Sequence, residues 1–140
     1  MRRLPDWRAR LGAHIAAHRV RPFAYGAHDC ATFAAGAVQA VTGSDPAPGL
    51  AGYTTRTDGI RRLRRSGLED HVAVVASRFA EIPTAQAQQG DLAVIEAAGG
   101  LSLGVVCGAF VLAPTRPSGL AAVPLTPTAV GGHVLKAFRV

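Results

Sequence analysis

Aromatic side chains and charges are both scarce in this 140-residue chain. Aromatic residues make up 6% of it and charged residues 17%, whereas hydrophobic residues make up 49%. This balance excludes an intrinsically disordered chain, because disordered chains are rich in charge and poor in apolar residues. With so few aromatics, the core must be built mainly from Ala, Val and Leu. The length suits one compact domain, which we expect to cover residues 1–140.

Long apolar runs are also missing. No run is long enough to cross a bilayer, so we expect no membrane span. The opening Arg2-Arg3 is followed by Pro5, Asp6 and Trp7 rather than by an apolar stretch, and we therefore expect no secretory signal peptide. Cysteine occurs only at Cys30 and Cys107. Without an export signal, free thiols are expected rather than a disulfide.

Lysine occurs only at Lys136, although the formal net charge is +6. The positive charge is therefore nearly all arginine, which favours an anionic partner and suits paired contacts at interfaces. The densest cluster, formed by Arg61, Arg62, Arg64 and Arg65, predicts a protein interface. A solvated helix face is the plainer alternative. No aromatic residues alternate with these arginines, so stacking on bases is not indicated and a nucleic-acid partner is not favoured.

The spacing of apolar residues changes near Gly90. Before it, helical periodicity and capping residues predict helices over 4–21, 29–42, 57–67 and 68–79. After it, short apolar runs separated by Gly and Pro predict strands over 92–95, 103–107, 109–113, 121–125 and 134–140. Helices followed by strands indicate an α+β fold, with N-terminal helices and then an antiparallel sheet of about five strands.

Cys30 follows Asp29, a residue suited to cap a helix. Exposed amide groups at a helix N-terminus favour the thiolate, so Cys30 is a candidate nucleophile. The alternative is a small buried side chain that only packs. His28 lies two residues earlier and is a candidate base, although it could instead hydrogen-bond the backbone and fix the turn. His71, expected in mid-helix, and His133, before the last strand, are placed by no motif.

Other ligand patterns are incomplete. His14 and His18 lie one helical turn apart, a spacing that can bind a metal, but no third ligand is clearly arranged beside them. No Gly-Lys-Ser/Thr sequence follows the glycine-containing stretches, so a phosphate loop is not indicated. We expect neither a metal nor a cofactor.

Four segments together resemble one known family. Tyr25-Gly26 followed by Asp29-Cys30-Ala31-Thr32-Phe33 resembles the nucleophile segment of the NlpC/P60 cell-wall peptidases. Residues 90–95, 103–108 and 111–114 resemble that family's later strands, in the same order. The resemblance implies an NlpC/P60-like (papain-like) fold with Cys30 at the nucleophile position.

The same comparison reveals two departures. Ser102 occupies the position of the family's general-base histidine, and Leu112 occupies the position of its third polar residue. Because both imidazole positions are vacated, the resemblance implies a catalytically degenerate copy. Activity would then require His28, or an imidazole from a partner chain, to serve as the base.

Further segments resemble a small family of tail proteins in tailed phages and prophages of proteobacteria. These are His28-Asp29-Cys30, residues 42–46, residues 52–55 and the final Ala-Phe-Arg-Val. This resemblance implies a structural tail-tip or baseplate component, assembled in the host cytoplasm and located in the virion tail. Its partners would be other tail proteins, such as hub or tail-fibre components, and in addition peptidoglycan. The alternative is an active cysteine peptidase or amidase that cleaves peptidoglycan stem peptides during cell-wall penetration.

Overall fold

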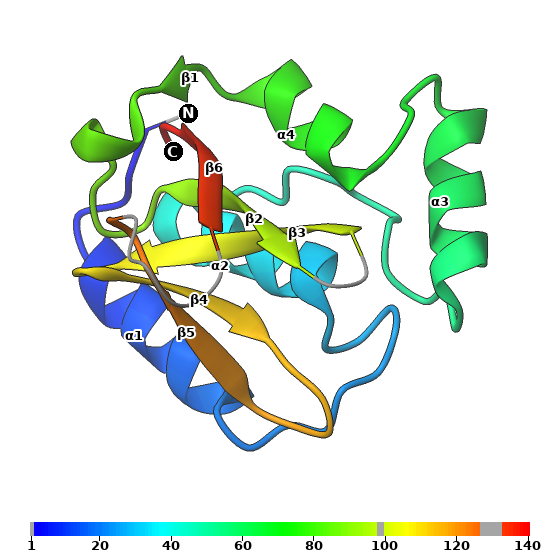
Figure 1. The fold of residues 1–140 in the computed structure, drawn as a ribbon, viewed down its shortest axis with the longest axis horizontal. Helices are drawn as coiled ribbons and strands as arrows, with labels where there is room; N and C mark the ends of the chain where they lie inside the picture. The colour runs from blue at the N-terminus through cyan, green and yellow to red at the C-terminus, as the bar shows by residue number, and fades with distance from the viewer. Residues whose placement is uncertain (1, 98–99, 127–132) are drawn as a thin grey trace.

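The computed structural model describes residues 2–97, 100–126 and 133–140, and in it helices precede a sheet (Figure 1). The helices are α1 (Trp7–His18), α2 (Cys30–Thr42), α3 (Arg56–Arg65) and α4 (His71–Arg78). The strands are β1 (Glu81–Ile82), β2 (Leu92–Ala97), β3 (Gly100–Cys107), β4 (Phe110–Pro114), β5 (Leu120–Pro124) and β6 (His133–Phe138). A short 3-10 helix, η1 (Thr84–Gln86), follows β1.

The described strands form one sheet in the order β1-β6-β2-β3-β4-β5, and every neighbouring pair is antiparallel. The α+β prediction is therefore confirmed, with six strands in place of about five. The additional strand, β1, has two residues and pairs with Phe138 and Ala137 of β6. Two residues are too few to show an alternating pattern, so β1 leaves no signal in the sequence.

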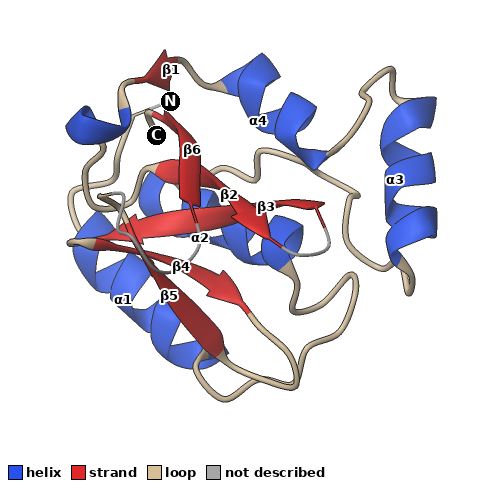
Figure 2. Cartoon of the chain, in the orientation of Figure 1, coloured by secondary structure: helices blue, strands red, loops and turns tan. Residues whose placement is uncertain are grey.

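Helices α1 and α2 pack against one face of the sheet, and α3 stands at the edge of the molecule (Figure 2). The main core lies between these helices and β2, β3 and β6. As the helical spacing predicted, α2 buries Phe33, Ala34, Ala37, Val38 and Val41. A smaller apolar cluster from β2, β3 and β4 occupies the opposite face of the sheet. Within the described residues, no helix is long and apolar enough to cross a membrane.

Two helix starts differ from the predicted ones. Thr55, not Thr57, caps α3. Helix α4 begins at His71 rather than near Leu68, because the Asp70 carboxylate accepts a hydrogen bond from the Ala73 N–H. A side-chain acceptor at this position satisfies a free amide of the first turn and fixes where the helix begins. His71 therefore lies at a helix N-terminus rather than in mid-helix.

Asp91 links the two ends of the chain. This fully buried carboxylate accepts hydrogen bonds from the Arg3 guanidinium at 2.9 Å and from the Val140 N–H at 3.0 Å. Arg3 also donates to the Val140 carbonyl, and the two termini lie close together (Figure 1). A buried carboxylate is tolerated only with such partners. The Gly-Asp-Leu motif at residues 90–92 thus has a structural explanation.

Candidate active site

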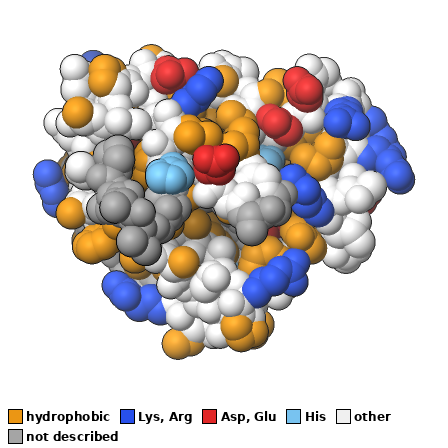
Figure 3. Space-filling view, in the orientation of Figure 1, with side chains coloured by type: hydrophobic (Ala, Val, Ile, Leu, Met, Phe, Trp, Pro, Cys, Tyr) orange, Lys and Arg blue, Asp and Glu red, His pale blue; other side chains and the backbone are white. Residues whose placement is uncertain are grey.

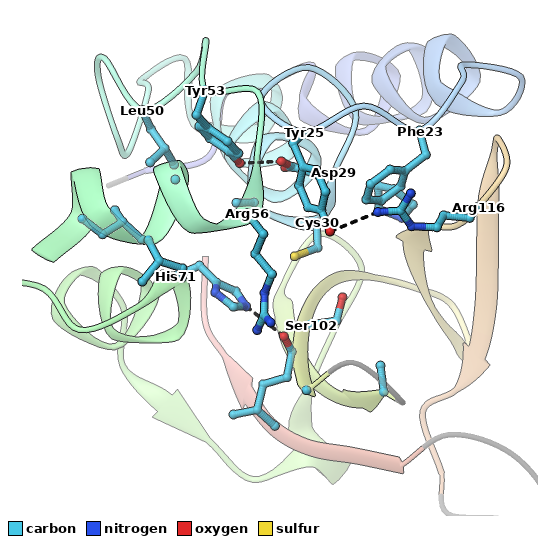
Figure 4. Close-up of a pocket in the computed structure, with 18 of the residues that line it drawn as sticks. Phe23, Tyr25, Asp29, Cys30, Leu50, Tyr53, Arg56, His71, Ser102 and Arg116 are labelled. Atoms are coloured by element: carbon cyan, nitrogen blue, oxygen red, sulfur yellow. Dashed lines mark hydrogen bonds between the residues drawn. The ribbon is translucent and has the colours of Figure 1, made fainter.

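A cleft of about 530 Å³ lies where the start of α2, the helices α3 and α4, and the start of β3 meet (Figure 4). Its walls are mainly apolar, but they carry side chains that can do chemistry and that come from distant parts of the sequence. Those side chains are Tyr25, Asp29, Cys30, Tyr53, Arg56, His71, Ser102 and Arg116.

Asp29 fixes the start of α2. Its buried carboxylate accepts hydrogen bonds from the Thr32 N–H, the Gly26 N–H and the Tyr53 hydroxyl. In return, the Thr32 hydroxyl accepts from the Asp29 N–H, which completes a capping box. The Phe33 N–H is bonded to the Asp29 carbonyl. Among the described residues, the N–H groups of Cys30 and Ala31 have no partner, so they are available to a ligand in the cleft.

Tyr53 holds the loop before α3 against this cap. Burial raises the pKa of the Tyr53 hydroxyl, and its hydrogen bond to Asp29 raises it further. The phenol therefore stays protonated and donates to the carboxylate. Gly26 makes the close approach possible. Its φ is +78°, and a Cβ there would lie 2.0 Å from the Tyr53 carbonyl oxygen.

The imidazole that lines the cleft with Cys30 belongs to His71 (Figure 4). The His71 Nε2 lies 2.9 Å from the Leu101 carbonyl oxygen. A carbonyl can only accept, so Nε2 carries the hydrogen and the neutral ring keeps its lone pair on Nδ1. The Leu101 carbonyl thus fixes the tautomer and orientation of the ring. This is the role that a third polar side chain has in a catalytic triad.

Cys30 and His71 shift each other's titration. Burial alone would raise the pKa of the Cys30 thiol, but the hydrogen bond and charge of His71, the Leu103 amide and the Ser102 hydroxyl together lower it. Burial alone would lower the pKa of His71, but the interaction with Cys30 and the hydrogen bond to Leu101 raise it. The two shifts bring the pKa values of thiol and imidazole closer together, and a thiolate beside an imidazolium is the reactive state of a cysteine nucleophile.

Ser102 and Leu112, the two positions where the NlpC/P60 peptidases carry a polar residue, have different surroundings in the structure. Ser102 lies in the cleft and its hydroxyl interacts with the Cys30 thiol. Ser102 therefore lies on the side of β3 that faces Cys30. Leu112 packs against the main core, and in the sheet it pairs with Val105 and Ala122. The imidazole in the cleft comes from His71, the first residue of α4.

His28 is not placed to serve as the base, which corrects the sequence-based assignment. It is fully buried, with Nδ1 2.8 Å from the His18 Nδ1 and Nε2 3.0 Å from the Gly119 carbonyl oxygen. Both ring nitrogens are therefore occupied, and the ring holds its loop in place. The sequence does not single out His71, because the predicted helix begins at Leu68 and therefore places His71 in mid-helix. Recognising Asp70 as a cap would have placed His71 at the helix N-terminus.

The remaining candidates lie outside the cleft. His14 contacts His18 by ring packing, and within the described ranges no three His, Cys, Asp or Glu side chains are grouped so as to hold a metal ion. Cys30 and Cys107 are both free. Arg61, Arg64 and Arg65 are exposed on α3, while Arg62 pairs with Asp58 at 3.3 Å. Figure 3 shows positive side chains gathered at that edge of the molecule.

One known protein family matches residues 2–140, which is nearly the whole chain. The chain belongs to the family described as a domain of unknown function, DUF6950. No curated protein matches it. The description of DUF6950 names no activity.

Proposed function

We propose that this DUF6950 protein is a cysteine peptidase or amidase with an NlpC/P60-like fold. The observation that carries the proposal is the pairing of Cys30 with His71 at the start of α2, inside a cleft. Nucleophile, base and orienting acceptor come from α2, α4 and β3 and meet at one point. A thiol and an imidazole whose pKa values are shifted by one another inside a cleft are typical of functional sites.

The residues support a two-step acyl transfer. The Cys30 thiolate attacks the carbonyl carbon of an amide, and the N–H groups of Cys30 and Ala31 are available to stabilise the oxyanion. His71 gives its proton to the departing amine as the C–N bond breaks, which leaves a thioester. A water molecule then attacks the thioester while His71 accepts its proton. The carboxylic acid leaves, and Cys30 regains its starting state.

The substrate class comes from the resemblance to the NlpC/P60 peptidases, which act on cell walls. We propose peptidoglycan stem peptides as the substrate and a phage-like tail tip as the location, with other tail proteins as partners. The expectation of a degenerate copy rested on the missing imidazoles at Ser102 and Leu112. A base on α4 removes the main reason for that expectation.

Purified peptidoglycan tests the proposal directly, with released amine groups as the readout. Cys30→Ala should abolish release, and His71→Ala should reduce it by about 10²- to 10⁴-fold, the usual contribution of a general acid–base. Cys107→Ser is the matched control, since Cys107 lies outside the cleft lining. Release that survives Cys30→Ala would rule out the proposed nucleophile. Failure of the wild-type protein to release amines would refute the proposed activity on this substrate.

The second candidate is a non-catalytic tail component that docks through Arg61, Arg64 and Arg65. Their exposure on α3 favours it, because a docking surface needs accessible side chains. This second candidate predicts a different result for variants of the arginines and of Cys30. Replacing these arginines would then block incorporation into tail particles, and replacing Cys30 would not.

A further inference from the structure

Two arginines line the cleft on opposite sides of Cys30 (Figure 4). Arg56 is the first residue of α3, and Arg116 lies in the turn between β4 and β5. Neither belongs to the Cys30–His71 pair. Both are exposed, so their charges face solvent and any ligand that enters.

Aromatic side chains hold Arg116 in place. Its guanidinium carbon lies 4.3 Å from the centre of the Phe23 ring and 5.3 Å from the centre of the Tyr25 ring. Its Nη2 donates a hydrogen bond to the Tyr25 hydroxyl at 3.0 Å. Stacking of this kind fixes the plane of a guanidinium and leaves its other N–H groups free to donate.

Arg56 extends from α3 toward β3. Its Nη2 would lie 3.3 Å from a Cβ built on Gly100, so the guanidinium covers the first residue of that strand. In Figure 4 the Arg56 side chain lies beside His71 and Ser102. A side chain at position 100 would compete for this space.

No acidic side chain among the described residues pairs with these arginines. Within the described residues, neither Arg56 nor Arg116 forms a salt bridge. The acidic residue of the lining, Asp29, is buried and already accepts hydrogen bonds from Gly26, Thr32 and Tyr53. An entering ligand therefore meets two cations against a mainly apolar wall.

We propose that Arg56 and Arg116 form a carboxylate-binding subsite, so that the cleft selects acyl or peptide substrates carrying a free carboxylate near the scissile bond. Guanidinium groups bind carboxylates through paired N–H donors. The apolar wall accepts the rest of a peptide better than a fully hydrated inorganic anion. The consequence for catalysis rests on the proposed function, whereas the anion preference can be measured without it.

Alkylation of Cys30 by two small reagents measures that preference. Iodoacetate carries a carboxylate where iodoacetamide carries a neutral amide of nearly the same shape. The rate ratio of the two reagents, divided by the same ratio for N-acetylcysteine, reports the attraction of the cleft for a carboxylate. In a Cys107→Ser background we expect a normalised ratio of about 10, since like-signed clefts concentrate counter-ions by that order or more. It should fall as salt is added.

The matched control separates the cleft arginines from the overall charge. Arg56→Gln with Arg116→Gln should lower the normalised ratio several-fold relative to the wild type. Arg61→Gln with Arg64→Gln removes the same charge from the same region, outside the cleft lining, and should leave the ratio nearly unchanged. A wild-type ratio near 1, or equal losses in the two double variants, would overturn the proposal. His71 is present in all of these proteins and cancels in the comparison.

Hydrolysis then tests the catalytic consequence. Soluble stem peptides are compared before and after their carboxylates are converted to amides with carbodiimide and ammonia. We expect amidation to lower kcat/KM about tenfold for the wild type and to have little effect on the Arg56→Gln, Arg116→Gln protein. Equal rates on both substrates would contradict carboxylate selection. If neither substrate is cleaved, the proposed function fails, and the alkylation ratio alone decides the subsite.

Discussion

At the scale of single residues, reactivity depends on how burial and pairing balance at Cys30. Burial opposes the thiolate, while His71, the Leu103 amide and the Ser102 hydroxyl favour it, and the net pKa of the thiol is lowered. The pKa of His71 is raised by the same contact. Acyl transfer by this pair needs a deprotonated thiol and a protonated imidazole, so rising pH favours the first group and disfavours the second. Activity should therefore follow a bell-shaped pH profile.

The titration of Cys30 is a direct prediction. In a Cys107→Ser background, the alkylation rate should show an inflection below the ordinary thiol value of about 8.5. His71→Ala should move this inflection upward, because the variant loses the charge and hydrogen bond that stabilise the thiolate. His28→Ala should leave it in place, since both ring nitrogens of His28 are bonded elsewhere. An inflection that responds to His28 and ignores His71 would reverse the assignment of the base.

The position of Cys30 at a helix start was predictable from the sequence, whereas the position of His71 in the same cleft was not. Asp29 and Cys30 are neighbours, so the cap and the thiol can be recognised from local spacing alone. His71 comes from a different helix, and the Leu101 carbonyl that orients it carries no sequence signature at all. A motif comparison with the NlpC/P60 peptidases looks for an imidazole on a strand, so it cannot point to His71 at the start of a helix.

At the scale of elements, the packing of α1 on α2 depends on Gly36. A Cβ at this position would lie 2.4 Å from the His14 Cε1. The ring has little room to move, because His14 Nε2 lies 2.9 Å from the Phe33 carbonyl oxygen and the ring stacks on Phe33. The contact would therefore have to be relieved by shifting the two helices.

Gly36→Ala is thus expected to destabilise the protein by about 1–3 kcal/mol, the usual cost of overpacking. Gly12→Ala on α1 is the matched control, because a Cβ there meets nothing within 4 Å. The control should gain about 0.5–1 kcal/mol from the higher helix propensity of alanine. Chemical denaturation followed by circular dichroism measures both. Equal gains in the two variants would show that the α1–α2 contact is not close-packed at Gly36.

Helices and strands with a clear apolar periodicity were predicted from the sequence. An element that is held only by pairing with a distant strand was not. The apolar periodicity and the Asp29 and Gly43 caps predicted α2 almost to the residue. Helix α1 is shorter than predicted: the predicted span begins at Leu4, but α1 begins at Trp7 and the Leu4 N–H donates to the Val41 carbonyl of α2. Strand β1 exists only because β6 supplies its partners.

At the scale of the whole molecule, a chain of hydrogen bonds joins α1 to two distant loops. His18 Nε2 lies 3.4 Å from Arg21 Nη1, His18 Nδ1 meets His28 Nδ1, and His28 Nε2 meets the Gly119 carbonyl. The carbonyl accepts and the guanidinium donates, so we assign one proton to each ring and one direction to the chain. A further proton on either ring would set two donors against each other.

This arrangement predicts that the protein loses stability in mild acid. Burial, together with the charges of His14, Arg21 and His28, lowers the pKa of His18 to about 4, and burial lowers that of His14 despite its bond to the Phe33 carbonyl. An unfolded histidine titrates near 6.5, so between these values the unfolded chain binds more protons than the folded one. The stabilisation is complete above pH 6.5 and is lost as the pH falls toward 4.

For His18 alone, the free energy of unfolding should fall by about 3 kcal/mol between pH 6.5 and 4. Urea denaturation across this range measures it, and NMR titration of the His18 ring should give a midpoint well below 6.5. His18→Gln keeps a polar group but cannot titrate, so its stability should vary less with pH. His133→Gln is the matched control, because His133 is exposed on β6. If His18→Gln kept the wild-type slope, the acid sensitivity would have to come from His14 or from the carboxylates, and not from protonation of His18.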